Sequence, residues 1–186
     1  YDFKKEMDKR YNINSLCILN PFDFKKIKKK SYEKAKKIYK KKDSLKLISV
    51  GRLTYQKDFF TLLKAIKILK NIKKIELVII GKGVEKKKLE NYALNEKFDS
   101  NVRFIGYQKN PFKFIKQADI FILTSLFEGS PNVLVEALFL KKYIISTNCP
   151  TGPREILENG KYGSLVKIGD YKQISKILMN YKKNKS

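Results

Sequence analysis

Residues 45–81 read LKLISVGRLTYQKDFFTLLKAIKILKNIKKIELVIIG, and this stretch decides the fold class. It opens and closes with a short apolar run that ends in Gly, LKLISVG (45–51) and IELVIIG (75–81). Between the two runs, apolar side chains recur at the spacing of one helical face, at Phe59, Leu62, Leu63, Ile66 and Leu69. A strand, a helix and a second apolar strand predict a β-α-β unit whose parallel strands are buried on both faces.

The same alternation continues along the rest of the chain. The pattern predicts further strands at 101–106, 119–125, 142–148 and 164–167. It predicts helices at 85–95, 111–117, 132–140, 153–158 and from about residue 171. We therefore expect an α/β domain over residues 44–186, built as a Rossmann-like doubly wound parallel sheet. In such a sheet, ligands bind in the loops at the carboxyl ends of the strands.

The first 43 residues depart from this pattern and predict a linker-like segment. Residues 15–19, SLCIL, are a strand-like apolar run, and the pair Asn20-Pro21 predicts a turn after it. Residues 25–42 then read KKIKKKSYEKAKKIYKKK and contain 11 Lys. We expect a first strand and a lysine-rich helix in this segment.

The charge of the chain limits its partners. Its 186 residues include 42 Lys and Arg against 18 Asp and Glu, a formal net charge of +24. Such an excess attracts nucleic acid or anionic membrane surfaces. The aromatic and basic pattern of RNA-binding sheets and zinc-finger spacings are both absent, so no specific nucleic-acid partner is expected. Two explanations remain: a lysine-rich composition without a function, and attraction to an anionic membrane surface.

Histidine is absent, and the two cysteines, Cys17 and Cys149, stand alone in apolar stretches. We therefore expect no zinc site, haem ligation or disulfide scaffold, and isolated thiols suit a reducing cytoplasm. No run of 18 uncharged apolar residues predicts a membrane-spanning helix. The sequence indicates a cytoplasmic protein, and the lysine excess leaves peripheral attachment to the inner face of the membrane open as an alternative.

The loop after the first strand carries two cations. Gly51 lets the backbone turn close to a ligand, Arg52 follows it, and Lys57 lies further along the same loop. Arg as a fork and Lys as a point charge suit a diphosphate. A surface loop of a basic protein is the alternative. Among the other loops, 81–83 favours a tight turn, and Gly106-Tyr107 offers free backbone groups and a ring to a base.

Residues 128–136, EGSPNVLVE, give the strongest local signal. The Gly-Ser-Pro run predicts a sharp turn into a helix that starts near Pro131 and points its first N–H groups toward a ligand. Glu128 precedes this helix and Glu136 lies inside its apolar sequence, where an acid needs a partner. Both carboxylates are suited to accept hydrogen bonds from sugar hydroxyls. A capping acid and a structural ion pair are the alternative.

These pieces together resemble the C-terminal, nucleotide-sugar-binding half of the retaining GT-B glycosyltransferases of family 4, the glycosyl transferases group 1. The resemblance spans about residues 15–180 in the right order. It rests on NPFD (20–23), VGRL with QK (50–57), IIGKGVEKKKLE (79–90), VRFIGY (102–107), ADIFILTSLFEGSPNVLVEAL (118–138) and GPREIL with NGKYGSLV (152–166). The spacing from Glu128 to Glu136 is similar to the Glu-x7-Glu element of that family.

The resemblance implies a role for each loop residue. Arg52 and Lys57 would hold the donor diphosphate beside Gly51, and Glu136 would bind the ribose. Glu128 would contact the transferred sugar, so the catalytic residues would be Glu128, Arg52 and Lys57. The Gly106-Tyr107 loop would meet the base. Backbone N–H groups would come from the turn formed by Gly129, Ser130, Pro131, Asn132, Val133 and Leu134.

The implied reaction transfers a hexose or N-acetylhexosamine from a UDP-sugar to a glycan or lipid-linked acceptor of bacterial surface polysaccharide, with retention. Protein cations would stabilise the leaving diphosphate, so neither a metal nor a cofactor is expected. An acceptor-binding first domain would complete the cleft, and the chain by itself would be inactive. Two alternatives stay open: a basic nucleotide-binding or membrane-docking module without catalysis, and another GT-B nucleotide-sugar enzyme such as an epimerase.

Overall fold

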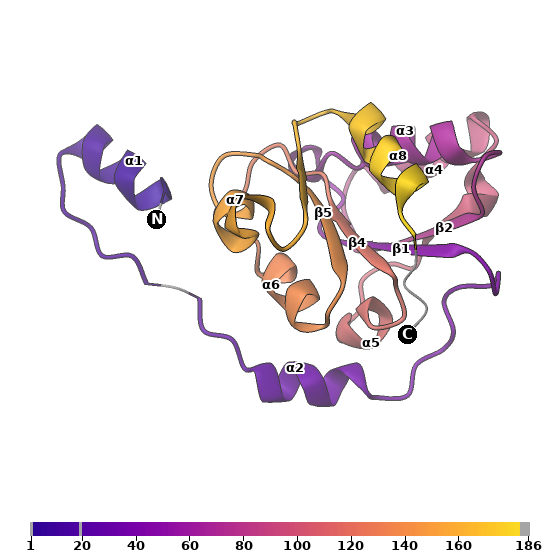
Figure 1. Ribbon diagram of the computed structural model, residues 1–186, viewed down its shortest axis with the longest axis horizontal. Coiled ribbons are helices and arrows are strands. Elements are labelled where there is room, and N and C mark those ends of the chain that lie inside the picture. The colour runs from indigo at the N-terminus through magenta and orange to yellow at the C-terminus, as the bar shows by residue number, and fades with distance from the viewer. Residues whose placement is uncertain (1, 19, 183–186) are drawn as a thin grey trace.

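The computed structural model describes residues 2–18 and 20–182 and contains a six-stranded, fully parallel sheet (Figure 1). The spatial order of its strands is β3-β2-β1-β4-β5-β6. The strands are β1 (Leu45–Val50), β2 (Ile75–Ile80), β3 (Val102–Phe104), β4 (Ile120–Leu123), β5 (Tyr143–Thr147) and β6 (Ser164–Val166). This is the doubly wound order expected of a Rossmann-like domain, and the direction of winding reverses between β1 and β4.

Helices cover both faces of the sheet, as the continuous apolar strands require. Alternate strand residues point to opposite faces, so Leu47 and Ile48 enter two different core clusters. One cluster is completed by α3 (Phe59–Leu69), α4 (Lys86–Asn95) and α8 (Tyr171–Asn180). The other is completed by α5 (Phe112–Ile115), α6 (Asn132–Phe139) and α7 (Pro153–Ile156). The Rossmann-like α/β class expected from the sequence is confirmed.

Two glycines bring the ends of β1 and β2 into contact. A Cβ on Gly81 would lie 1.8 Å from the carbonyl oxygen of Gly51, and one on Gly83 would lie 2.2 Å from the carbonyl oxygen of Leu53. The Leu53 N–H also donates to the Lys82 carbonyl at 2.9 Å. The turn expected at 81–83 lies slightly later, at residues 84–85 before α4. The close approach of the two strand ends holds Lys82 beside the loop that carries Arg52.

The remaining short elements lie in loops. Three 3-10 turns are η1 (Tyr55–Lys57), η2 (Asp99–Asn101) and η3 (Glu158–Gly160). Asp58 adopts a left-handed conformation, with φ of 40°, and its side chain accepts from the Thr61 N–H to cap α3. This cap ends the loop that follows β1 and fixes the position of Lys57.

The N-terminal segment differs from its expected form at two points. A helix, α1 (Asp2–Tyr11), precedes the run at 15–19, and the sequence interpretation missed it. The described residues of that run, 15–18, form no strand, and residue 19 lies outside the described residues. Leu16 and Ile18 are 83% and 81% exposed, because no strand of the described sheet lies beside them. A strand needs a neighbour for its backbone hydrogen bonds, so the apolar pattern alone was not sufficient.

The lysine-rich helix is shorter than the sequence suggested. It is α2 (Phe24–Ser31), capped by the Asp23 side chain, and it packs against α5. Residues 32–42 continue as irregular chain instead of helix. Their backbone N–H groups bind side chains of the sheet domain: Lys40 and Lys41 donate to the Glu76 carboxylate at 2.7 and 2.8 Å, and Ile38 donates to Gln117 at 3.2 Å. These tertiary bonds replace the helical ladder.

Glu76 anchors this irregular segment from a buried position on β2. Its carboxylate also accepts from the Ser44 hydroxyl at 2.6 Å. Burial alone would raise the pKa of Glu76, but these hydrogen bonds and the Arg103 guanidinium hold the pKa below its usual value. Ile38 and Tyr39 are consequently buried in the core cluster that α5 and α6 complete.

The last feature of the fold concerns its helices and the membrane. Among the described residues, no helix is long and apolar enough to cross a membrane.

Candidate functional site

A cavity of about 650 Å³ opens at the carboxyl edge of the sheet, where the winding direction reverses between β1 and β4. Crevices at this point are the usual ligand sites of doubly wound sheets. Its walls come from the ends of β1 and β2, the loop after β3, the start of α5, the helix α6, and the segment around α2. We call it the switch-point cavity, and its lining residues are Pro21, Phe22, Asp23, Lys26, Ile27, Lys30, Val50, Gly51, Arg52, Ile80, Gly81, Lys82, Tyr107, Gln108, Lys109, Pro111, Phe112, Asn132 and Glu136.

Most of the charged residues that line the switch-point cavity are cations. Arg52 is one of the residues expected from the sequence, and it is joined by Lys82 from the next loop. The Lys82 ammonium lies 5.8 Å from the centre of the Tyr107 ring. Three further lysines line the cavity, Lys26, Lys30 and Lys109. This excess of positive charge over the two acids of the cavity, Asp23 and Glu136, suits a ligand with more than one negative charge.

Glu136 is the acid that α6 turns toward the cavity. It is half-buried in the second turn of an otherwise apolar helix, and no ion pair among the described residues includes it. Burial raises the pKa of the Glu136 carboxyl. An acid held in this way is available as a hydrogen-bond acceptor for a ligand hydroxyl.

Glu128 and Lys57 lie together, but outside the residues that line the switch-point cavity. The Lys57 ammonium contacts the Glu128 carboxylate, and the two side chains are only 13% and 7% exposed. The Ser125 hydroxyl donates to the same carboxylate at 2.5 Å. The structure therefore places Arg52 in the cavity and pairs Lys57 with Glu128, although the sequence interpretation assigned both cations to one diphosphate.

The loops that carry Lys57 and Glu128 are joined by further bonds. The Leu126 N–H donates to the Gln56 carbonyl at 2.8 Å, and the Gln56 side chain donates to the Phe127 carbonyl at 2.9 Å. The Thr151 hydroxyl donates to the Glu128 carbonyl, which ties the loop after β5 to the same place. The ion pair thus lies inside a fixed junction of three loops.

The residues between Glu128 and the first turn of α6 line two different cavities. Pro131 is the residue before α6, as expected, and Asn132 in the first turn lines the switch-point cavity. Its side chain accepts from Asn20 at 2.6 Å, which joins α6 to the N-terminal segment. Gly129 and Ser130 instead line a second cavity of about 930 Å³, shared with the segment 4–22.

The other residues of the predicted set lie in the first turn of α6 and in the loop after β3. Val133 follows Asn132 in the first turn of α6, whose N–H groups have no acceptor within the helix. The Leu134 side chain is fully buried in the core. Gly106 has a positive φ of 69° and open space where a Cβ would lie. Its neighbour Tyr107 is 67% exposed, so its ring is accessible at the cavity rim.

The sequence interpretation missed part of the lining. Lys82 was hidden in a glycine pair that was interpreted only as a turn. Lys26 and Lys30 stand one helical turn apart in a long lysine run, where nothing marks two residues as different from the rest. NPFD (20–23) did contribute to the resemblance, but without an assigned role. No cluster of three or more His, Cys, Asp or Glu that could hold a metal ion occurs in the described part of the chain.

A fully parallel sheet with the order β3-β2-β1-β4-β5-β6 and a cavity at its switch point defines a Rossmann-like domain of GT-B type. The family model of glycosyl transferases group 1 matches residues 31–186, and the chain belongs to this family. A glycosyltransferase of Methanocaldococcus jannaschii is 39% identical over 164 residues, which cover 80% of this chain and 40% of that protein. Other relatives include lipopolysaccharide glycosyltransferases.

Two further comparisons concern function and fold. The N-acetylgalactosamine-N,N'-diacetylbacillosaminyl-diphospho-undecaprenol 4-alpha-N-acetylgalactosaminyltransferase of Campylobacter jejuni is 33% identical over 122 residues, 66% of this chain and 33% of the enzyme. HepE of Anabaena, solved in complex with UDP-glucose, superposes with a TM-score of 0.67 at 20% identity, over 73% of this chain and 38% of HepE. The chain thus spans 33–40% of the lengths of the three proteins named here.

Proposed function

We propose that this chain is the donor-binding half of a retaining glycosyltransferase and that its switch-point cavity holds UDP-sugar. The observation that carries the proposal is the meeting of Arg52, from the loop after β1, and Glu136, from α6, in one cavity. A cation for a diphosphate and an acceptor for hydroxyls are the two groups that a nucleotide-sugar requires. The solved complexes of HepE with UDP-glucose support the choice of nucleotide.

In this proposal, each part of the ligand meets one part of the site. The base lies by Tyr107, the ribose hydroxyls donate to Glu136, and the diphosphate lies between Arg52 and the first turn of α6. The transferred sugar then extends toward Glu128, which Lys57 and Ser125 hold in place. Lys82 adds a cation that the sequence interpretation had not included.

The chemical step in this proposal is electrostatic. When the bond from the anomeric carbon to the diphosphate breaks, negative charge grows on the leaving oxygen. Arg52 and the N–H groups of α6 stabilise that charge, and Lys57 would reach the same diphosphate from its place beside Glu128. Because protein cations supply this stabilisation, the proposal requires neither a divalent metal nor a cofactor. The sugar is a hexose or N-acetylhexosamine, the class transferred by the Campylobacter jejuni relative.

Acceptor binding is assigned to a second domain. The recognisable site residues of the chain all lie at one edge of one sheet, so they form one wall of a two-walled cleft. A glycan or lipid-linked acceptor is the proposed second substrate, in keeping with the diphospho-undecaprenol named for the Campylobacter jejuni relative. A cytoplasmic location also remains part of the proposal. Binding to an anionic membrane surface would use residues other than these site residues.

Replacing Arg52 tests the proposal directly. Arg52→Ala should weaken UDP binding by about 1.5–3 kcal/mol, roughly 10- to 150-fold, because a hydrogen-bonded charge is removed from the diphosphate. Titration calorimetry in the presence of a chelator measures both this loss and the independence from metal. Arg10→Ala, on α1 and outside both cavities, is the matched control and should leave the affinity unchanged. Equal affinity of the Arg52 variant and the wild-type chain would remove Arg52 from the site.

Glu136 should show opposite effects on binding and on stability. Glu136→Gln should weaken UDP binding, because its proposed partner is the ribose. The same change should raise the melting temperature slightly at neutral pH, because burial opposes the ionised carboxylate. A raised pKa in the folded state means that this group favours folding below that pKa and disfavours it as the pH rises through it. Melting temperatures measured from mildly acidic to neutral pH should therefore fall less in the variant than in the wild-type chain, because the variant has no carboxyl at position 136 to ionise.

The alternative that the site also allows is a nucleotide-binding module without transfer. Such a module would show the same Arg52 and Glu136 effects on UDP. It would not need Glu128, because that residue lies beyond the nucleotide cavity. Loss of sugar transfer on Glu128→Gln in an assembled two-domain enzyme, with unchanged UDP affinity, would therefore exclude it.

A further inference from the structure

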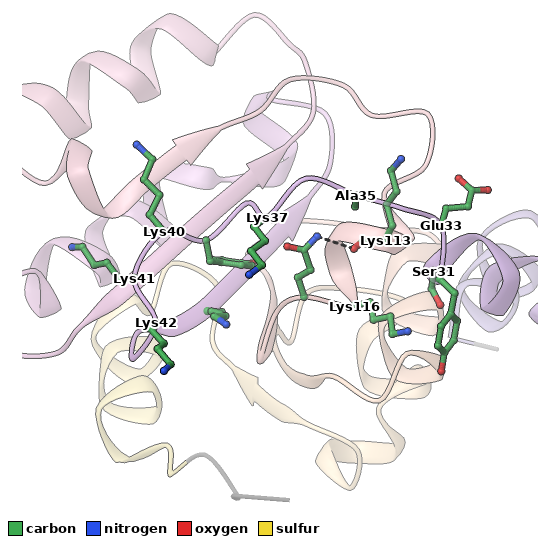
Figure 2. Close-up of a pocket in the computed structure, with 13 residues that line it drawn as sticks. Ser31, Glu33, Ala35, Lys37, Lys40, Lys41, Lys42, Lys113 and Lys116 are labelled. Atoms are coloured by element: carbon green, nitrogen blue, oxygen red, sulfur yellow. Dashed lines mark hydrogen bonds between the residues drawn. The ribbon is translucent and has the colours of Figure 1, made fainter.

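A second strongly basic site lies away from the switch-point cavity. It is a cavity of about 760 Å³ between the irregular segment 31–42 and α5, shown in Figure 2. We call it the lysine-rich cavity, and its lining residues are Ser31, Tyr32, Glu33, Ala35, Lys37, Tyr39, Lys40, Lys41, Lys42, Lys46, Lys113, Lys116 and Gln117. Seven of the thirteen are Lys and one is an acid.

The fold holds this segment by its backbone, so its lysine side chains are not needed for packing. The N–H groups of Lys40 and Lys41 bind Glu76, and the Gln117 side chain donates to the Lys36 carbonyl at 3.2 Å. The side chains of Lys40, Lys41 and Lys42 project from the segment in Figure 2. No ion pair in the described part of the chain includes them. Gathering like charges without acids opposes folding, so a partner that supplies negative charge would stabilise the arrangement.

The lysine-rich cavity continues into a wider basic surface. Residues 25–42 contain 11 Lys and one Glu, and ten of these lysines are exposed. The helix α2 lies at the outer edge of the molecule in Figure 1. It carries five of the 11 lysines, and its Ile27 is buried. We name residues 25–42, with Lys46, Lys113 and Lys116, the lysine-rich face.

We infer that the lysine-rich face docks on an anionic phospholipid bilayer, with headgroup phosphates in the lysine-rich cavity. Clusters of four to eight cations on or beside an amphipathic helix are sufficient for such docking. Phe24 and Tyr32 are 42% and 70% exposed at the two ends of α2, where aromatic side chains suit a bilayer interface. The lysine-rich cavity shares no lining residue with the switch-point cavity, although Lys26, Ile27 and Lys30 of the lysine-rich face line the latter. The inference can therefore be tested apart from the proposed donor site by changing only lysines of the lysine-rich cavity.

The aromatic contacts favour a bilayer over nucleic acid. Binding of single strands depends on free ring faces on which bases stack. The Lys116 ammonium lies over the Tyr32 ring. The Phe24 ring packs against Phe22 and Phe139, with centroids 5.8 and 4.8 Å apart. A bilayer needs no free ring face, since exposed ring edges and lysine ammonium groups are sufficient for insertion among headgroups.

Vesicle binding tests this inference. The 186-residue chain should bind vesicles of equal parts phosphatidylglycerol and phosphatidylcholine at physiological ionic strength, and it should not bind pure phosphatidylcholine. A fourfold variant, Lys37→Gln, Lys40→Gln, Lys41→Gln and Lys42→Gln, should bind about 600-fold more weakly, since each lysine contributes about fivefold. Co-sedimentation measures both values, and higher salt should weaken the wild-type binding.

A matched control separates a defined face from net charge. Lys87→Gln, Lys88→Gln, Lys172→Gln and Lys176→Gln lower the charge equally on α4 and α8, on the other side of the sheet. This variant should keep most of the vesicle binding. Both variants should keep the UDP affinity of the wild-type chain and should melt at no lower temperature, because each removes like charges. Equal loss of vesicle binding in both variants would overturn the inference. So would wild-type binding to a single-stranded DNA oligonucleotide as tight as to the anionic vesicles at the same salt.

Discussion

Residues 1–186, supplied with UDP-sugars and candidate lipid-linked or lipopolysaccharide acceptors, should transfer no sugar. Transfer requires donor and acceptor in near-attack contact, and fixing that geometry can supply roughly 7–11 kcal/mol of the barrier. The residues proposed for the donor all lie at one edge of one sheet. An open site is also wet, which weakens the stabilisation of the leaving diphosphate. Mass spectrometry of the acceptors measures the result.

Two controls make this absence of transfer informative. The same preparation must bind UDP, which shows that the donor wall is intact. The full-length Campylobacter jejuni relative, with its own acceptor, must give product under the same conditions. Repeated turnover by the 186-residue chain alone would contradict the assignment of acceptor binding to a second domain, and it would leave the nucleotide assignment untouched.

Glu128→Gln should destabilise the fold by about 3 kcal/mol, the lower end of the range for breaking a buried ion pair. The reason is that the Lys57 ammonium, 13% exposed, would lose the ion-pair partner that it has among the described residues. Lys57→Met should cost a similar amount. Because both changes break one interaction, the double variant should cost less than the sum, by about 1–3 kcal/mol. Urea unfolding of the wild-type chain, the two single variants and the double variant measures the four free energies of this double-mutant cycle.

An exposed pair in the same chain provides the comparison. Lys161 and Glu158 are 3.0 Å apart with side chains 65% and 54% exposed, and Glu158→Gln should cost less than about 1 kcal/mol. The folded Glu128→Gln variant should bind UDP almost as tightly as the wild-type chain, because Glu128 does not line the switch-point cavity. Additive costs for the Lys57 and Glu128 changes would show that the pair contributes no coupling. Equal weakening of UDP binding by the Glu128 and Glu136 variants would contradict their separate roles.

Several features follow from the sequence alone because they depend on local spacing. The apolar runs at 45–51 and 75–81 and the helical face from Phe59 to Leu69 define a β-α-β unit without knowledge of its neighbours. The repeat of that unit implies a parallel sheet and places the ligand loops at one edge. Arg52 after a strand and Pro131 before a helix were identified in the same way, and the structure places both where the spacing predicts.

Other features needed the tertiary structure because they depend on residues distant in the sequence. The run at 15–18 has the composition of a strand, but it has no strand beside it, so it stays single. The lysines at 32–42 have no helical ladder because Glu76 and Gln117 take their backbone donors. Neither outcome can be inferred from a window of neighbouring residues.

The site shows the same division. The sequence motifs, through the resemblance that they carry, brought forward Arg52, Lys57, Glu128 and Glu136 as one group. The sheet order decided that Arg52 and Glu136 line one cavity while Lys57 and Glu128 pair beside it, and it added Lys82 through the contact of Gly81 with Gly51. The sequence by itself determined which loops follow the strands and hold the candidate residues, because strand ends are local. Only the tertiary structure decided which side chains meet, because that depends on how the strands are ordered and how closely their loops approach.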